Sequence, residues 1–153
     1  RGILSTHLFT DGALTEILHI PAGGSALPAS HDTVEKMQHF VYMGGKEVFR
    51  YAVRYLSDAA KLALETNQVR PEDVDWVVAH QANMRILNTV SARLKIPLDK
   101  FVLNIERLGN TSSASIPLAL DEAVRDGRIK ENELLLMTAL GGGISWGSAL
   151  LRW

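Results

Sequence analysis

Apolar residues recur at helical spacing over three stretches of the chain. The longest stretch, residues 45–66, places apolar side chains along one side of a helix, at Val48, Ala52, Tyr55, Leu56, Ala59, Leu62 and Ala63. This spacing predicts an amphipathic helix, and Pro71 lies beyond its end as a stop. Similar patterns over 82–94 and 113–125 predict two further helices. Serines are available to cap the start of the last one, and Gly127 lies where it would end.

Short apolar runs predict the strands. The run "VDWVVA" at 74–79 predicts a strand buried on both faces, and "KFVLNI" at 100–105 predicts a shorter one. Near the end of the chain, two strong strand candidates at 133–140 and 144–153 surround three glycines. Strands and helices therefore alternate through the middle of the chain.

The first 43 residues contain a predicted hairpin and then a long connection. Residues 3–20 carry two apolar runs around Asp11-Gly12, a pair that readily takes the positive φ values of a tight turn. From Pro21 to about Met43 no periodicity is sustained, so this connection exceeds the usual length of about 4 to 6 residues. Such a loop is either functional or mobile.

The predicted order of elements is ββ, α, β, α, β, α, ββ. Alternation in the middle with hairpins at both ends predicts an α/β fold, a mixed five-stranded sheet with covering helices (ββαβαβαββ). At 153 residues, the chain suits a single domain.

Composition and charge exclude several classes of protein. A hydrophobic content of 46% with 22% charged residues is typical of a globular protein that can bury a core. No apolar run approaches the roughly 20 residues that a membrane span needs, and the start lacks a signal-peptide core, so a cytoplasmic protein is expected. A net charge of -1 argues against nucleic acid as the main ligand. The five histidines show no metal-binding spacing, and we expect no metal site.

Polar side chains follow three of the predicted strands. His80 comes directly after the buried strand 74–79, Asn110 lies between the next strand and its helix, and Gly141 to Gly143 form the final turn. The carboxyl ends of parallel strands share an edge of the sheet, so His80 and Asn110 could meet there. Taken singly, each is more often structural: a hydrogen-bonded histidine, a turn asparagine and a flexible glycine hairpin. Together they supply an imidazole, an amide donor and backbone N–H groups, the parts that hold a developing oxyanion.

Three longer motifs then carry a resemblance. The segments "HQANMRIL", "RLGNTSSASIPLALDEAVRDGRI" and "LGGGISWGSALLRW" resemble, in order and spacing, the carboxyl-terminal half of β-ketoacyl-acyl-carrier-protein synthase III. That family starts bacterial type II fatty-acid synthesis. The segments "GILSTHLFTDG" and "MGGKEVFRYAVR" are also similar to it, so the resemblance spans the chain. It implies a thiolase-like fold of two similar halves, of which residues 1–153 would be the C-terminal domain.

The resemblance also implies the chemistry. The family uses a Cys-His-Asn set, in which His80 and Asn110 match the histidine and asparagine, and a backbone N–H at Gly142 matches part of the oxyanion hole. The chain contains no cysteine, so the nucleophile is expected in an absent N-terminal half and the fragment alone is expected to be inactive. The implied reaction condenses a short acyl-coenzyme A with malonyl-acyl-carrier protein by decarboxylative Claisen condensation. Coenzyme A and phosphopantetheine thioesters are then substrates, and no cofactor is implied.

Further positions match the family's substrate tunnel and its mouth. Asn83 and Gly45 match tunnel positions that meet the phosphopantetheine arm, and Leu140 stands where the family would place phenylalanine. A basic surface for acyl-carrier protein and coenzyme A is implied at Arg50, Arg85 and Arg93. The resemblance further implies a homodimer of the complete enzyme, with no nucleic acid or membrane as partner.

Two other interpretations stay open from the sequence. The same pair of His80 and Asn110 would serve a condensing enzyme that primes a polyketide or quinolone pathway. The missing nucleophile also allows a non-catalytic half that only binds a partner subunit. Fatty-acid initiation is favoured because "GNTSSAS" followed by "DEAVRDGRI" resembles that family more than the secondary-metabolic ones.

Overall fold

The computed structural model describes residues 1–153, which form a mixed four-stranded sheet between layers of helices and a separate two-stranded sheet. The predicted α/β class is confirmed. The strands are β1 (Gly2–Thr10), β2 (Leu18–His19), β3 (Tyr42–Met43), β4 (Trp76–Ala79), β5 (Leu134–Gly141) and β6 (Ser145–Arg152). The α-helices are α1 (His31–Glu35), α2 (Gly45–Thr66), α3 (Met84–Leu94), α4 (Ile105–Leu108) and α5 (Ser115–Arg125). Short 3-10 turns occupy Gly12–Ile17, Pro71–Asp73, Leu98–Lys100 and Ser112–Ala114.

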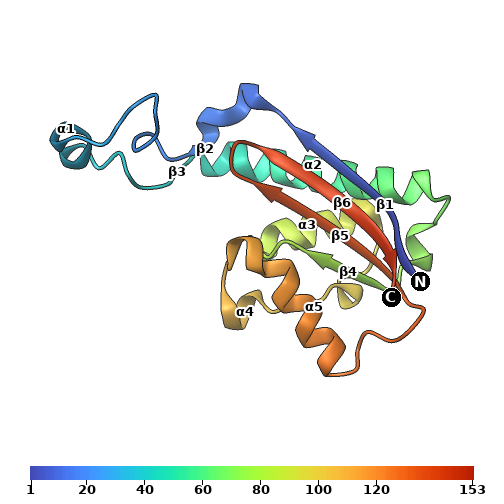
Figure 1. Ribbon diagram of the computed structural model, residues 1–153. Coiled ribbons are helices and arrows are strands. Elements are labelled where there is room, and N and C mark those ends of the chain that lie inside the picture. The colour runs from blue at the N-terminus through green and yellow to red at the C-terminus, as the bar shows by residue number, and fades with distance from the viewer.

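The main sheet has the order β1-β6-β5-β4. β5 runs parallel to β4 and antiparallel to β6, while β1 pairs antiparallel with β6 along the edge. The β1–β6 register begins with Gly2 opposite Arg152, so both ends of the chain meet at one end of the sheet (Figure 1). The β5–β6 turn lies at the other end, together with the carboxyl end of β4.

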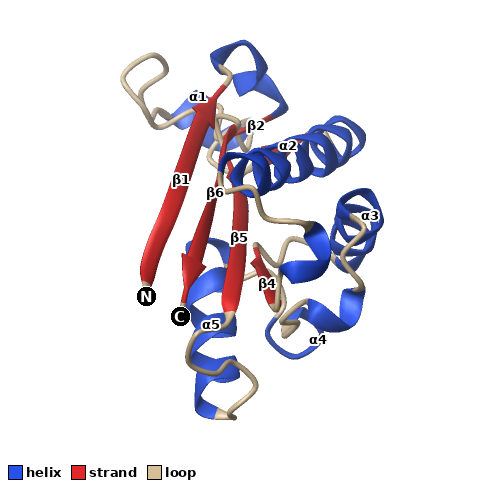
Figure 2. Ribbon diagram, turned by 90° about the vertical axis from the view of Figure 1, so that its right-hand side faces the viewer, coloured by secondary structure: helices blue, strands red, loops and turns tan.

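Helices cover the two faces of the sheet unequally (Figure 2). α2 and α3 bury the larger core, which includes Leu56 of α2, Leu87 of α3 and Leu136 of β5. α5 covers the opposite face beside β4, where Ala119 packs in a smaller core with Val78. The strand β4 therefore has apolar neighbours on both faces, as its continuous apolar run predicts.

The predicted hairpin around Asp11-Gly12 is wrong. The side chain of Asp11 accepts a hydrogen bond from the N–H of Ala13 at 3.1 Å and caps the 3-10 turn Gly12–Ile17. This turn carries the chain away from the sheet, and β1 takes the distant β6 as its partner. The second run continues only as the short β2, which pairs with β3. Local capping by an aspartate thus outweighs the turn preference of Asp-Gly.

The predicted strand at 100–105 is also wrong, and the main sheet has four strands. Phe101 makes one parallel bridge to Val77, and the N–H of Val102 donates to the carbonyl of Val77 at 2.9 Å. α4 then begins at Ile105, so the segment leaves the sheet after this one bridge. An apolar run of this length satisfies a buried strand or a buried irregular segment equally well.

The long connection from 21 to 43 extends beyond the end of the sheet and carries α1 (Figure 1). Ser30 and Thr33 form a reciprocal capping box at the start of α1, which gives this segment local order. Its apolar side chains remain largely in solvent, including Phe40 at 69% and Val41 at 65% exposure. No helix in the molecule has the length and apolar character needed to cross a membrane.

Candidate active site

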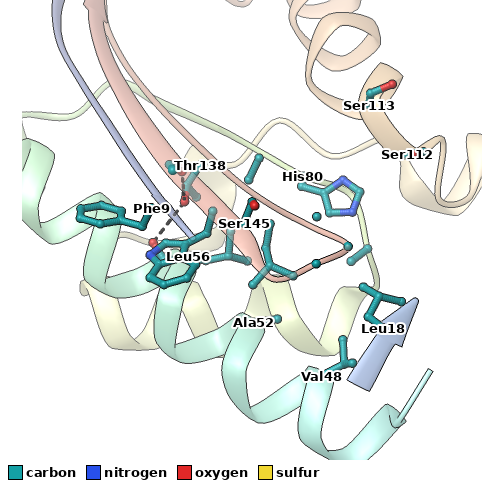
Figure 3. Close-up of a pocket in the computed structure, with 18 of the residues that line it drawn as sticks. Phe9, Leu18, Val48, Ala52, Leu56, His80, Ser112, Ser113, Thr138 and Ser145 are labelled. Carbon is teal, nitrogen blue, oxygen red and sulfur yellow. Dashed lines mark hydrogen bonds between the residues drawn. The ribbon is translucent and has the colours of Figure 1, made fainter. Parts of the chain in front are cut away.

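A cavity opens at the end of the sheet where β4 finishes and β5 turns into β6 (Figure 3). Four of the positions singled out in the sequence line this cavity: His80, Asn110, Leu140 and Gly142. His80 and Asn110 thus lie at one cavity, but the predicted reason holds only for His80, because Asn110 follows α4 and not a strand. β2 closes another side of the cavity through Leu18.

His80 is held at the end of β4 by backbone and side-chain contacts. Its N–H donates to the carbonyl of Thr138 at 2.9 Å, which extends the β4–β5 ladder by one residue. The imidazole Nδ1 lies 3.1 Å from the hydroxyl of Ser115, while Nε2 makes no hydrogen bond with the protein. Burial of the ring lowers the pKa of His80 below its ordinary value, so the neutral imidazole is the favoured form.

Asn110 lines the same cavity but is exposed and not hydrogen-bonded to His80. Its side-chain oxygen accepts a hydrogen bond from the N–H of Ser112 at 3.0 Å, the turn role that asparagine often takes. That bond orients the amide and leaves its NH2 group without a protein partner. The geometry therefore combines a structural role for the oxygen with a free donor beside the cavity.

The three glycines form the turn between β5 and β6. The N–H of Gly143 donates to the carbonyl of Leu18 at 3.3 Å, and this bond ties the turn to β2. Gly143 has a φ of 67°, which favours glycine. At Gly142, by contrast, an added Cβ would lie 3.6 Å from the nearest atom, an ordinary contact. Packing within this chain therefore does not require glycine at Gly142.

A second, smaller pocket groups the positions assigned to the substrate arm. Gly45 and Asn83 line it, as do Phe49 and Arg85. The side-chain oxygen of Asn83 caps α3 by accepting a hydrogen bond from the N–H of Ile86 at 2.9 Å. The guanidinium of Arg85 lies 5.4 Å from the centre of the Phe49 ring, a cation–π arrangement. The structure thus brings Gly45, Asn83 and Arg85 together, apart from His80.

The other two arginines are exposed and line neither pocket. Arg50 lies over the ring of Tyr51 at 4.9 Å, and Arg93 approaches Asp58 to 3.7 Å. Both are held by contacts at the surface. Such contacts are individually weak and leave the side chains free to rearrange.

Sequence reasoning assigned no role to two residues that organise the cavity. Ser115 is buried and contacts His80; the only signal for it was the serine-rich run after Asn110. Gln81 is also fully buried, and its amide donates to the carbonyls of Ala79 at 3.0 Å and Val102 at 3.1 Å. Its oxygen accepts from the N–H of Asn104 at 3.3 Å. Gln81 thus ties the end of β4 to the segment that leads to Asn110.

No three His, Asp or Glu side chains lie close enough together to hold a metal ion. The cavity instead offers an imidazole, a carboxamide and backbone N–H groups. These groups are donors suited to a negatively charged oxygen.

Comparison with known proteins assigns the family. Residues 64–153 match the family model described as 3-Oxoacyl-[acyl-carrier-protein (ACP)] synthase III C terminal. The chain belongs to this family. A beta-ketoacyl-[acyl-carrier-protein] synthase III of Caldanaerobacter subterraneus subsp. tengcongensis is 45% identical over 152 residues, which are 99% of this chain and 46% of that protein. The chain therefore spans less than half the length of the curated relatives it matches.

Solved structures of synthase III proteins share the fold. The 3-oxoacyl-[acyl-carrier-protein] synthase III of Aquifex aeolicus VF5 superposes with a TM-score of 0.86 at 41% identity, covering 99% of this chain and 44% of that one. The priming beta-ketosynthase of the R1128 polyketide pathway superposes with a TM-score of 0.82 at 35% identity, covering 99% and 45%. The thiolase-like half predicted from the sequence is confirmed as the fold.

Proposed function

We propose that residues 1–153 are the C-terminal domain of a condensing enzyme that starts fatty-acid synthesis. It would join a short acyl group from acyl-coenzyme A to malonyl-acyl-carrier protein by decarboxylative Claisen condensation. The single observation that carries the proposal is the shared cavity of His80, Asn110 and Gly142 at the carboxyl end of β4. Membership of the synthase III family supports the same reaction.

In the proposed reaction, a thiol of the N-terminal half first takes the acyl group from coenzyme A, which leaves as its own thiol. This chain contains no cysteine and cannot supply that thiol. Loss of carbon dioxide from the malonyl thioester then places negative charge on the thioester oxygen. The N–H of the His80 imidazole and the amide of Asn110 would hold this enolate oxygen, because both are donors without a competing protein acceptor.

The enolate carbon then attacks the acyl thioester, a carbon–carbon bond forms, and the enzyme thiol leaves. The tetrahedral oxygen formed on the way would be held by backbone N–H groups, one of them at Gly142. Packing within the chain does not require glycine at position 142. We infer that glycine is needed there because a side chain would keep the substrate away from the backbone N–H. This observation supports the oxyanion role for the turn.

The carrier's phosphopantetheine arm would pass the second pocket, where Asn83, Gly45 and Arg85 gather. The NH2 group of Asn83 is free to bind it, because only the oxygen of that side chain caps α3. Arg50 and Arg93, together with Arg85, would attract the acidic carrier protein and the phosphates of coenzyme A. Leu140 lines the cavity in place of an expected phenylalanine and would contact the acyl chain.

Exposed apolar side chains support the domain assignment. On the edge strand β1, Leu8 is 83% and Ile3 70% exposed. On the face of the sheet that lies opposite α2 and α3, α5 covers only the part near β4. An N-terminal half would cover such surface, and the complete enzyme is proposed to be a cytoplasmic homodimer. Alone, the chain is expected to self-associate, which sedimentation would detect.

Two measurements test the proposed function: transfer of the acyl group to the protein and release of carbon dioxide. The complete protein containing this chain should become labelled by radioactive acetyl-coenzyme A and release carbon dioxide from malonyl-acyl-carrier protein. The 153-residue chain alone should do neither. Stable acylation of the isolated chain would overturn the domain proposal, and a complete protein that neither acylates nor decarboxylates would overturn the reaction.

A condensing enzyme that primes a polyketide pathway is the second candidate, since the R1128 priming ketosynthase superposes over 99% of this chain. The two candidates run the same chemistry and differ in the primer and the carrier protein. Competition between acetyl-coenzyme A and longer acyl-coenzyme A primers, with carrier proteins of each pathway, would separate them. Preference for acetyl-coenzyme A and the fatty-acid carrier supports the first.

A further inference from the structure

Two hydroxyl groups lie behind the imidazole of His80, on the side away from its free Nε2. The hydroxyl of Ser115, which is 1% exposed, lies 3.1 Å from Nδ1 of His80. The hydroxyl of Thr111 donates to the same Ser115 oxygen at 3.3 Å. Ser115 has no other side-chain hydrogen bond, so these three residues form a closed relay.

We infer that Ser115, oriented by Thr111, is a positioning residue that fixes the tautomer of His80 with its proton on Nε2. The inference rests on the proposed function, in which His80 donates a hydrogen bond to the substrate oxygen. It gives a role to Thr111 and Ser115, two residues of the segment "GNTSSAS" for which the family resemblance implied none.

The number of available protons determines the tautomer of His80. A serine hydroxyl has one proton to donate and two lone pairs to accept. The bond from Thr111 uses a lone pair of the Ser115 oxygen, and the serine proton then has one remaining partner, Nδ1 of His80. A nitrogen that accepts has no proton of its own. With Nδ1 accepting, the single proton of a neutral imidazole lies on Nε2. The alternative, in which Nδ1–H donates to Ser115, is disfavoured because it leaves the buried serine proton without a partner.

The surroundings make this choice of tautomer matter. Burial favours the neutral imidazole, which has only one N–H, so a ring with the proton on Nδ1 would present an acceptor to the cavity. Ser115 is the first residue of α5, and that helix packs on β4 through Ala119. The hydroxyl is thus carried on a rigid element, next to the strand that ends at His80.

The first experiment reads the tautomer directly. Magic-angle-spinning 15N spectra of the sedimented 153-residue chain, labelled in its imidazoles, distinguish protonated from unprotonated ring nitrogens even if the chain self-associates. His80→Gln identifies its signals among the five histidines. At a pH where the ring is neutral, we expect the proton mainly on Nε2. Ser115→Ala should lower the ratio of the Nε2–H tautomer to the Nδ1–H tautomer by about 2- to 10-fold, which corresponds to the free energy of one hydrogen bond.

Matched variants separate the hydroxyl from the shape of the site. Ser115→Thr retains the hydroxyl and should restore the ratio, and Thr111→Val should shift it in the same direction as Ser115→Ala but less. Ser113→Ala removes an exposed hydroxyl from the same run and should change nothing. If Ser115→Ala fails to fold, Thr111→Val still decides. A proton mainly on Nδ1 in the parent chain, or an unchanged ratio in both variants, would overturn the inference.

The second experiment uses the complete protein. Ser115→Ala should reduce kcat for decarboxylation by a similar factor, about 2- to 10-fold, with KM for malonyl-acyl-carrier protein unchanged and Ser115→Thr restoring kcat. An unchanged kcat would overturn the positioning role. The two failures are distinguishable: a tautomer that responds as expected in a protein without condensing activity keeps the relay and refutes the proposed function.

Discussion

Two regions of the molecule hold their polar groups in different ways. One is the cavity edge, where His80 and Gln81 lie, and the other is the arginine surface, formed by Arg50 and Arg93. At the cavity edge, His80 and Gln81 are anchored by backbone strands and by buried partners at hydrogen-bond distance. On the arginine surface, Arg50 and Arg93 are exposed and touch only an aromatic ring and one carboxylate. One region has its geometry fixed by the fold, and the other is free to adapt to whatever approaches.

This difference indicates which step each region serves in the proposed reaction. Oxyanion stabilisation depends on donors already in place when charge develops, because reorganisation at that moment would cost free energy. Attraction of a charged partner depends on net charge and requires little precision. Changes at the cavity edge should therefore affect turnover and stability, whereas changes at the arginines should affect encounter.

The largest expected effect is on turnover. His80→Ala in the complete protein should slow decarboxylation of malonyl-acyl-carrier protein by roughly 10²- to 10³-fold, the usual loss for one oxyanion donor. Carrier-protein affinity and the salt dependence of kcat/KM should stay near those of the parent. Steady-state release of carbon dioxide at several salt concentrations measures both. An equal loss of affinity for the carrier protein would show that the cavity edge also governs binding of that partner. This result would contradict the contrast between the two regions.

The next effect is on stability. Gln81→Ala should lower the free energy of unfolding by about 1–3 kcal/mol, because it leaves the buried N–H of Asn104 and two carbonyls without partners. Urea unfolding followed by circular dichroism measures this change. Asn88→Ala removes an exposed amide from α3 and should change stability by less than about 0.5 kcal/mol. Equal effects of the two variants would mean that the hydrogen bonds of Gln81 contribute nothing to stability.

A smaller effect is expected from the arginine surface. Arg93→Glu in the complete protein should reduce kcat/KM for malonyl-acyl-carrier protein by about 10-fold and remove much of its salt sensitivity, since exposed charges are screened beyond about 8–10 Å. The substitution also places a like charge near Asp58. Arg125→Glu, on the last turn of α5 and outside both pockets, is the control. If Arg93→Glu keeps the salt response of the parent, the carrier-protein role of this surface is refuted.

The smallest effect concerns pH. Burial lowers the pKa of His80 in the folded chain, so below its ordinary value of about 6.5 the unfolded chain binds more protons. The contribution of His80 to stability is therefore present above that value and is lost as the pH falls through it towards the folded pKa. As the pH is lowered below about 6.5, urea midpoints should fall more steeply in the parent than in His80→Gln. Parallel profiles would show that the ring is not appreciably desolvated.

Much of this arrangement could be predicted from the sequence. The 3.6-residue period predicted the bounds of α2, residues 45–66, because most of its apolar face is buried; Leu62, at 36% exposure, and the half-buried Tyr55 are exceptions. His80 and Gly142 line one cavity from strand ends, whereas Asn110 reaches the same cavity from the loop after α4. These successes rest on periodicity and on the rule that parallel strands share an edge.

What could not be predicted depends on contacts between distant residues. Nothing local to Asp11 shows that β1 would pair with β6 from the other end of the chain. The apolar residues near Phe101 satisfy a buried loop as well as a strand, so only the tertiary contact with Val77 decides. The contact between Ser115 and His80 is likewise invisible to spacing, because it depends on how α5 docks against β4.

The pairing of β1 with β6 has a consequence for how the chain is made. Within residues 1–153, β1 is synthesised before the other strands, yet its only partner in the main sheet is β6, the last of these strands. Until β6 emerges, β1 has an unpaired backbone and exposed apolar side chains such as Leu8. Contacts between the ends of a chain close late and slowly. While residues 11–144 are synthesised, β1 is therefore open to pairing with other chains, and we expect a ribosome-bound chaperone to cover it during that interval.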